Sequence, residues 1–273
     1  MLINGSASAT ISALDRGLHY GDGLFETLAV VAGEPCLWQR HMTRLELGCR
    51  RLGIEFPDAN RLLEEVYLEI GERSHGVVKI ILTRGSGGRG YRPAQKHKAP
   101  TRLVNFSAWP AYPEEWSITG VQVRFCTTRL GCNPLLAGLK TLNRLEQVMA
   151  RAEWDDPEIA EGLLLDSEGR VVEGTMSNLF LLHGDRLTTT DLIRCGVAGV
   201  MRELVLEQAD QLGFFPVIED LLPHHLQTAD ALFLTNSLIG IWPVRKLGEW
   251  LYDAHRVPPR LIAAVKQRGF QIG

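Results

Sequence analysis

Strand-like and helix-like hydrophobic patterns alternate along this 273-residue chain, and one proline-punctuated stretch interrupts them. Alternation of this kind indicates helices packed against β-sheet. The interruption is Trp109-Pro110-Ala111-Tyr112-Pro113, whose composition is typical of a connection between domains. We therefore expect an α/β fold of the α+β type, with an N-terminal domain at 1–108, a linker at 109–115 and a C-terminal domain at 116–273.

The individual elements follow from β-branched runs and from apolar residues at helical spacing. Before the linker we expect strands at 27–31, 77–82 and 103–108, a helix that includes Leu37 and Leu52, and a helix at 61–70. After the linker we expect strands at 121–127, 178–182 and 231–235, a hairpin at 162–172, and helices at 142–154 and 200–212. In the helix at 142–154, the residues expected to face inward are Leu145, Val148, Met149 and Ala152.

Composition argues against several classes of function. The formal charge is -3 and the basic residues are scattered, so the sequence shows no basic cluster that would bind nucleic acid or a membrane surface. The N-terminus does not read as a secretory signal, and no apolar run approaches the roughly 20 residues that cross a bilayer. The five cysteines have no Cys-x-x-Cys spacing, so we expect reduced thiols in a cytoplasmic protein. His224 and His225 would point apart without a third ligand, so no metal site is expected.

A glycine-rich segment, Gly85-Ser86-Gly87-Gly88-Arg89-Gly90, matches the G-x-G-x-x-G pattern of dinucleotide-binding proteins. That site needs a helix directly after the glycines, because the helix N-terminus holds the pyrophosphate. Here Tyr91-Arg92-Pro93-Ala94-Gln95-Lys96 follows, which is polar and broken by proline. We interpret the segment as a loop, either merely flexible or bringing Arg89 and Tyr91 over a neighbouring pocket.

Lys140 lies in a mostly apolar segment, Asn133–Lys140. Burying an ammonium group is costly, so the segment alone favours a lysine that extends its charged end into water. The alternative is a desolvated lysine, whose lowered pKa makes the amine a usable nucleophile or base.

The segments Arg129–Pro134 and Gly138–Glu146 resemble the lysine region of the aminodeoxychorismate lyases. These enzymes belong to the fold-type IV pyridoxal-phosphate family, together with D-amino-acid and branched-chain aminotransferases. The resemblance implies a smaller N-terminal α/β domain and a larger C-terminal domain with a barrel-like sheet. Other segments resemble family motifs in the same order over nearly the whole chain: Gly21–Thr27, His41–Leu45, Thr83–Tyr91, Val172–Phe180, Gly196–Arg202 and Thr235–Ser237.

The resemblance implies pyridoxal 5'-phosphate as the cofactor. Lys140 would hold it as a Schiff base and act as the general acid/base. Glu173 would face the ring nitrogen and keep it protonated, which strengthens the electron sink. The phosphate would be bound by Arg44, the backbone N–H groups of Val200 and Met201, Asn236 and Ser237. Without the resemblance, the same residues would be interpreted as a solvated helix arginine, a strand-end glutamate, a core helix and a turn.

The resemblance also implies a substrate and an assembly. Arg89 and Tyr91 are the candidates for carboxylate recognition, with Phe25 and Thr27 lining the substrate pocket. The implied reaction converts 4-amino-4-deoxychorismate to 4-aminobenzoate and pyruvate, and the implied assembly is a homodimer with its active sites near the interface.

Two other classes of function remain open from the sequence. An aminotransferase on the same scaffold would use Lys140 and Glu173 but would leave the cofactor aminated. The other class is a cofactor-free binding protein or a dinucleotide-dependent reductase that uses the glycine segment.

Overall fold

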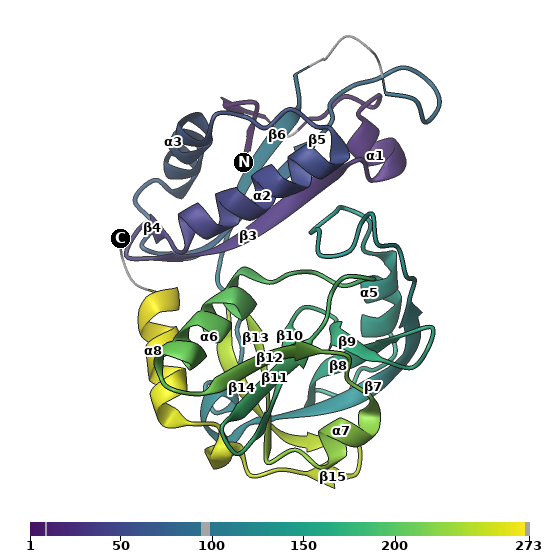
Figure 1. Ribbon diagram of the computed structural model, residues 1–273. Helices are drawn as coiled ribbons and strands as arrows, with labels where there is room; N and C mark the ends of the chain where they lie inside the picture. Colours follow the sequence, from purple (N-terminus) through teal and green to yellow (C-terminus); the bar gives the residue numbers. More distant parts are fainter. Residues whose placement is uncertain (9, 94–98, 271–273) are drawn as a thin grey trace. The chain divides into compact units, whose positions relative to one another are not determined.

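The computed structural model describes residues 1–8, 10–93 and 99–270, which form two compact units (Figure 1). The first unit contains Met1–Pro110, Leu139–Asn143 and Phe270–Gly273. The second contains Ala111–Gly138 and Arg144–Gly269. The first passage between the units thus lies inside the expected linker. The sequence patterns did not anticipate that the short segment around Lys140 groups with the N-terminal residues.

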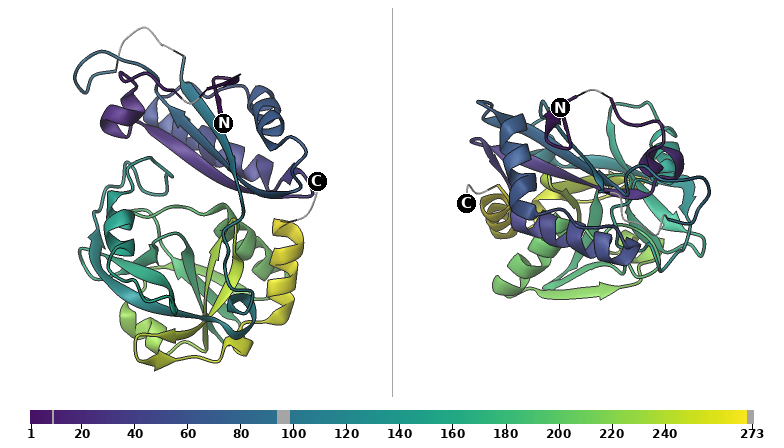
Figure 2. Two further views of the ribbon diagram at one scale, coloured as in Figure 1. Left: turned by 180° about the vertical axis from the view of Figure 1, so that it is seen from behind. Right: turned by 90° about the horizontal axis from the view of Figure 1, so that it is seen from above.

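The first unit is an antiparallel sheet with helices on one face (Figure 2). In its described part the strand order is β2-β1-β6-β5-β3-β4. The N-cap Asp58 starts the second long helix by accepting hydrogen bonds from the N–H groups of Asn60 and Arg61. The elements are β1 (Leu2–Ile3), β2 (Ser6–Ala7), α1 (Arg16–Tyr20), β3 (Gly23–Val31), β4 (Glu34–Pro35), α2 (Trp38–Leu52), α3 (Ala59–Ile70), β5 (His75–Thr83) and β6 (Thr101–Ser107).

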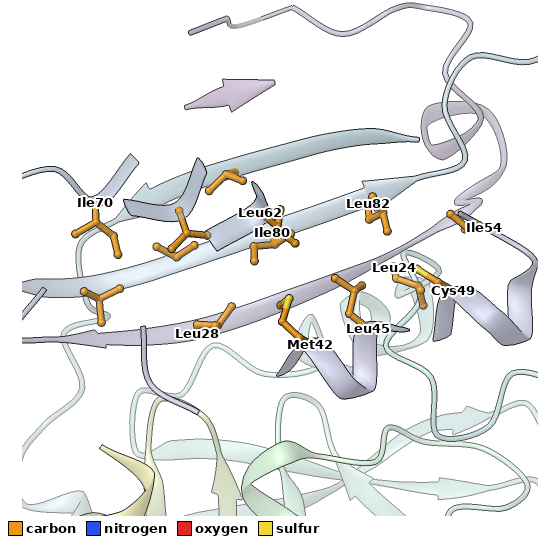
Figure 3. Close-up of a cluster of buried hydrophobic side chains, with 14 of the residues drawn as sticks. Leu24, Leu28, Met42, Leu45, Cys49, Ile54, Leu62, Ile70, Ile80 and Leu82 are labelled. Carbon is orange, nitrogen blue, oxygen red and sulfur yellow. The ribbon is translucent and has the colours of Figure 1, made fainter. Parts of the chain in front are cut away.

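The core of this unit lies between the sheet and the two long helices (Figure 3). Alternate residues of β3 and β5, such as Leu24 and Ile80, point toward α2 and α3 because strand side chains alternate between the two faces. Met42 and Leu45 of α2 pack against them. The strand at 77–82 and the helix at 61–70 are therefore confirmed, each slightly longer than predicted.

The second unit contains a larger mixed sheet. Among the described residues its order is β12-β11-β10-β13-β14-β7-β8-β9, and β15 also pairs with β14. The helices α6 and α8 lie side by side (Figure 1). The elements are α4 (Trp116–Thr119), β7 (Val121–Leu130), α5 (Leu145–Arg151), β8 (Ile159–Asp166), β9 (Val171–Gly174), β10 (Asn178–His183), β11 (Arg186–Thr190), α6 (Val200–Gln211), β12 (Phe215–Glu219), α7 (Pro223–Gln227), β13 (Ala231–Asn236), β14 (Gly240–Leu247), β15 (Trp250–Leu251), a 3₁₀ turn η1 (Ala254–Arg256) and α8 (Pro259–Gly269).

One prediction for this unit was wrong. The helix expected at 142–154 is shorter, and Leu145, Val148 and Met149 are 76%, 61% and 63% exposed instead of inward-facing. Ala152, which follows the end of α5, is exposed as well. The only buried residue of α5 is Ala150, and α5 packs against β7 and β8. The apolar spacing correctly indicated a helix, but it could not reveal that most of the apolar face points away from this chain's own core.

The glycine segment is a loop in the structure, as predicted. Residues 91–93, the described residues directly after the glycines, contain no helix that could hold a pyrophosphate in the manner of a dinucleotide site. Residues 94–96, which the sequence argument also used, lie outside the described residues. Of the helices that the structure describes, none is long and apolar enough to span a membrane.

Candidate functional site

Lys140 is presented by a short extended segment that pairs with the start of β3. The N–H of Phe25 donates to the Lys140 carbonyl (3.0 Å), the N–H of Leu142 donates to the Gly23 carbonyl (3.0 Å), and Leu24 is bridged to Thr141. Because side chains alternate along an extended segment, Leu139 enters the core while Lys140 takes the opposite face. The lysine is half-buried, and its Nζ lies 4.4 Å from the centroid of the Phe25 ring.

A second lysine shares the same aromatic ring. Lys79 on β5 is paired with Thr27 on β3, and its Nζ lies 5.1 Å from the Phe25 centroid. The structure thus brings together three predicted residues, Phe25, Thr27 and Lys140, and adds Lys79, which sequence reasoning missed. Its position in the middle of an otherwise apolar strand was the available signal.

On the other face of β3, Glu26 forms a buried charged cluster with two residues of α2. The Nδ1 of His41 lies 2.7 Å from a Glu26 carboxylate oxygen, and Arg44 donates to both oxygens through Nε (2.9 Å) and Nη2. Burial raises the pKa of Glu26, but Arg44 and His41 outweigh it and bring this pKa down to about 2. Burial lowers the pKa of His41, against the opposing effect of Glu26.

Two of these three residues were not predicted as site residues. The structure places Arg44 against Glu26, while its predicted contact with a phosphate stays a prediction. The Nε2 of His41 is buried and has no hydrogen-bond partner among the described residues. A buried polar atom without a partner costs about 1–3 kcal/mol, so this atom is a candidate contact for a bound group.

The substrate candidates Arg89 and Tyr91 lie on the loop Gly85–Tyr91, which we call the glycine loop. Both side chains are exposed, and Tyr91 packs against Tyr20 with ring centroids 5.5 Å apart. The loop is held through Arg16, whose guanidinium donates to the carbonyls of Gly90 and Tyr91. Arg16 was not predicted, and no local sequence pattern indicates such a contact.

In the second unit, Glu173 lies on β9 and is only 4% exposed. One carboxylate oxygen accepts a hydrogen bond from the N–H of Val197 (2.8 Å). Burial lowers the pKa of the Arg144 guanidinium, and the negative charges of Glu173 and Glu146 partly offset this effect. Glu173 is therefore a buried carboxylate next to a cation, and the interpretation as an exposed strand-end residue is wrong.

Hydrogen bonds with three other residues hold the turn at 196–199 in place. Glu173 binds the Val197 N–H, Asn178 donates to the Val197 carbonyl (2.9 Å), and Gly138 exchanges hydrogen bonds with Gly196 and Ala198. A Cβ at Gly196 would lie 2.7 Å from a Leu192 methyl carbon and 3.2 Å from a Glu173 oxygen. The close packing and the φ of +85° explain why a glycine occupies this position.

The turn leads directly into α6. Gly199 is the N-cap, and the helical hydrogen bonds begin with Glu203 N–H to the Gly199 carbonyl (3.1 Å). The N–H groups of Val200 and Met201 therefore precede the helix's own hydrogen-bond ladder, as an anion site requires. Their side chains are buried in the core.

A second buried carboxylate, Glu161, organises the turn between β9 and β10. It accepts hydrogen bonds from the N–H groups of Thr175 (3.0 Å) and Met176 (3.1 Å) and from the Ser177 hydroxyl (2.8 Å). Asn236 then donates to the Met176 carbonyl (3.1 Å) and accepts from the N–H groups that follow it, while Ser237 is half-buried. Phosphate contact by Asn236 and Ser237 stays a prediction.

Each unit by itself offers functional groups that suit a phosphorylated pyridine aldehyde. A half-buried primary amine is present at Lys140, a buried carboxylate at Glu173, and a helix N-terminus behind a glycine turn at 196–199. The unpartnered Nε2 of His41 is a further polar atom for a bound group. Among the described residues, no group of three or more His, Cys, Asp or Glu could hold a metal ion.

The comparisons with known proteins agree on one family for this chain. The model of the family described as amino-transferase class IV matches residues 23–247. Aminodeoxychorismate lyase of Vibrio harveyi is 39% identical over 242 residues, covering 89% of each protein. A putative branched-chain-amino-acid aminotransferase of Methanocaldococcus jannaschii is 32% identical and covers 86% of this chain and 82% of that relative.

A solved structure is also similar over nearly the whole length. The 4-amino-4-deoxychorismate lyase of Pseudomonas aeruginosa is 50% identical, with a TM-score of 0.93, and the similarity covers 97% of this chain and 98% of that one. The expected fold-type IV architecture is thereby confirmed. The chain belongs to the class IV aminotransferase family of pyridoxal-phosphate enzymes.

Proposed function

We propose that this protein is a lyase that converts 4-amino-4-deoxychorismate to 4-aminobenzoate and pyruvate, a step of folate biosynthesis. The observation that carries the proposal is the similarity to the Pseudomonas aeruginosa lyase, at 50% identity over 97% of this chain. The glycine loop and the segment after Lys140 resemble the lyases in sequence, which supports the same choice.

Lys140 and Glu173 are the residues that would take part in the chemistry. Pyridoxal 5'-phosphate, when bound, supplies an electron sink next to the substrate nitrogen. Lys140 would hold the cofactor, and its amine, once free, would remove the proton from the ring carbon that bears the substrate nitrogen. Glu173, a buried carboxylate, would face the pyridine nitrogen and keep it protonated. Loss of the proton would break the bond between the ring carbon and the enolpyruvyl oxygen, whose electron pair leaves with the oxygen. The released enolpyruvate takes up a proton to become pyruvate, and the ring becomes aromatic.

The remaining predicted residues would bind and orient. Arg44, the N–H groups of Val200 and Met201, Asn236 and Ser237 would bind the phosphate. Phe25 and Thr27 would contact the substrate ring.

The substrate carboxylates need cationic partners. Arg89 and Tyr91 are the candidates predicted from sequence. Lys79 would be an additional partner for a substrate carboxylate. Its ammonium lies against the same Phe25 ring as that of Lys140, which supports this role.

We further propose a cytoplasmic homodimer. Five free cysteines support a reducing compartment. Leu145, Val148 and Met149 are exposed at i, i+3 and i+4 on one face of α5, which supports a subunit interface, because exposed apolar patches often mark sites of protein–protein contact.

The test is a product assay with purified protein and 4-amino-4-deoxychorismate. We expect equal amounts of 4-aminobenzoate and pyruvate, and neither product from Lys140→Ala. Mass spectrometry after borohydride reduction should find the cofactor attached at Lys140. Products formed at the wild-type rate by Lys140→Ala would refute the assignment.

The alternative is an aminotransferase, which the similarity to the Methanocaldococcus jannaschii relative favours. It predicts that D-alanine or a branched-chain amino acid converts the cofactor spectrum to that of pyridoxamine phosphate. Such a conversion, without formation of 4-aminobenzoate from aminodeoxychorismate, would replace the lyase proposal.

A further inference from the structure

Arg16, the first residue of α1, is a buried arginine that uses all three of its guanidinium nitrogens. It is 5% exposed. Its Nε donates to Asp22 (2.8 Å), its Nη1 to the Gly90 carbonyl (3.0 Å) and its Nη2 to the Tyr91 carbonyl (3.0 Å). One side chain therefore binds two consecutive carbonyls at the far end of the glycine loop.

The near end of the loop is tied to the same segment through the backbone. The N–H of Arg16 donates to the Gly85 carbonyl (3.0 Å), and the N–H of Gly87 donates to the Leu14 carbonyl (3.3 Å). The buried carboxylate of Asp15 accepts hydrogen bonds from the hydroxyls of Thr83 (3.0 Å) and Thr101 (2.7 Å), which lie before and after the loop.

The carboxylate that orients Arg16 is itself fixed. Asp22 also accepts two hydrogen bonds from Arg84, through Nε (2.8 Å) and Nη2 (2.9 Å). Arg84 in turn donates to the carbonyls of Leu52 (2.8 Å) and Gly53 (2.6 Å) at the end of α2. The guanidinium of Arg16 is thus held by a chain of charged hydrogen bonds that reaches a long helix.

We propose that Arg16 is a positioning residue that fixes the glycine loop in the conformation that presents Arg89 and Tyr91 to the substrate. This inference rests on the proposed function. Glycines at 85, 87, 88 and 90 give the loop high backbone freedom, so an ordered loop needs external hydrogen bonds. Hydrogen bonds from a charged donor to backbone carbonyls are the stronger kind.

The first test replaces Arg16 by lysine. Lysine keeps the charge near Asp22, but one ammonium cannot reproduce the planar fork to both carbonyls. We expect amide hydrogen exchange in the peptide covering 85–91 to accelerate roughly tenfold, and the KM for aminodeoxychorismate to rise roughly tenfold. The kcat and the affinity for pyridoxal phosphate should change less than about twofold.

Arg102→Lys is the matched control, since Arg102 is also a buried arginine of this unit but donates to Glu65 and not to the loop. Exchange in the 85–91 peptide should then stay near the wild-type rate. Thermal melting and cofactor absorbance establish that each variant is folded.

A second test perturbs the contact from the loop side. A Cβ at Gly87 would lie 2.7 Å from the Arg16 Cδ, whereas a Cβ at Gly88 would meet nothing within 4 Å. Gly87→Ala should therefore loosen the loop and raise the KM, and Gly88→Ala should do neither. Both variants remove one glycine from the same loop, so their difference isolates the contact with Arg16.

Wild-type exchange in folded Arg16→Lys and Gly87→Ala proteins would overturn the proposal. So would accelerated exchange with an unchanged KM, because the loop would then be tied by Arg16 without serving the substrate. Failure of the wild-type protein to release 4-aminobenzoate would instead overturn the proposed function. The exchange measurement needs no substrate, so it separates the two failures.

Discussion

Glu173 shows how much a single residue depends on its surroundings. Its sequence neighbours are those of an ordinary strand end, yet the folded chain buries its carboxylate and binds it through the Val197 N–H. A buried carboxylate needs nearby hydrogen-bond donors or cations, which the Val197 N–H and Arg144 supply.

We predict that Glu173→Gln keeps the fold and the bound cofactor but lowers kcat by about 10²–10⁴-fold. A neutral amide cannot hold a proton on the pyridine nitrogen. The checks are steady-state kinetics and the cofactor spectrum. A kcat within about threefold of wild type would contradict the proposed role.

The contact between β3 and α2 should make the stability of the folded chain depend on pH. Glu26 and His41 are both buried, and the pKa of each is lowered in the folded chain. On acidification, the unfolded chain therefore takes up each proton at a higher pH than the folded chain does. It protonates His41 below the ordinary pKa of 6.5 and Glu26 below the ordinary pKa of 4.5. Stability should fall as the pH drops through both ranges.

The measurement is the free energy of unfolding between pH 8 and pH 4, for wild type and His41→Asn. An amide in place of the imidazole can still donate to Glu26, but it does not titrate. The variant should lose the decline that begins near pH 6.5 and keep the decline that begins below pH 4.5. Identical profiles would show that His41 does not titrate differently in the two states.

The turn before α6 allows a second prediction. Gly196 and Gly213 both have left-handed backbone, with φ of +85° and +79°. A Cβ at Gly196 would collide with Val172 and Leu192, while one at Gly213 would meet nothing within 4 Å. Alanine at either position should lower the free energy of unfolding by about 1 kcal/mol, because of the left-handed backbone. At Gly196 the collisions should lower it by about 1–3 kcal/mol more.

Only Gly196→Ala should also weaken cofactor binding, because its turn carries the Val197 N–H that binds Glu173. Chemical denaturation and titration with pyridoxal phosphate measure the two effects. Equal losses of stability in the two variants would contradict the close packing argued for Gly196.

For the whole molecule, the exposed side of α5 is the feature that a single chain does not explain. Val148 and Met149 are 61% and 63% exposed, although both are apolar. We predict that Val148→Glu shifts the protein from dimer to monomer, with little change in the stability of the single chain. Ile118→Glu on α4, also at an exposed apolar position, is the matched control.

Sedimentation velocity at micromolar concentration distinguishes the two species. A monomeric wild-type protein would rule out the proposed dimer. A Val148→Glu protein that stays dimeric would place the interface elsewhere.

Local sequence patterns predicted the main elements of both units in part, and the ordered motifs indicated the family. Strand and helix periods are local properties, so the strand at 77–82 and the helix at 61–70 could be predicted from short windows. The ordered motifs around Lys140, Glu173 and the turn at 196–199 were sufficient to indicate a fold-type IV pyridoxal-phosphate enzyme.

Which side chains meet across distant segments could be learned only from the folded chain. Arg16 reaches carbonyls 74 and 75 residues away, and Lys79 shares the Phe25 ring with Lys140. The folded chain also shows that Glu173 is buried and that the apolar face of α5 is not. Burial and long-range hydrogen bonds arise from packing between elements, and no local window of sequence contains that information.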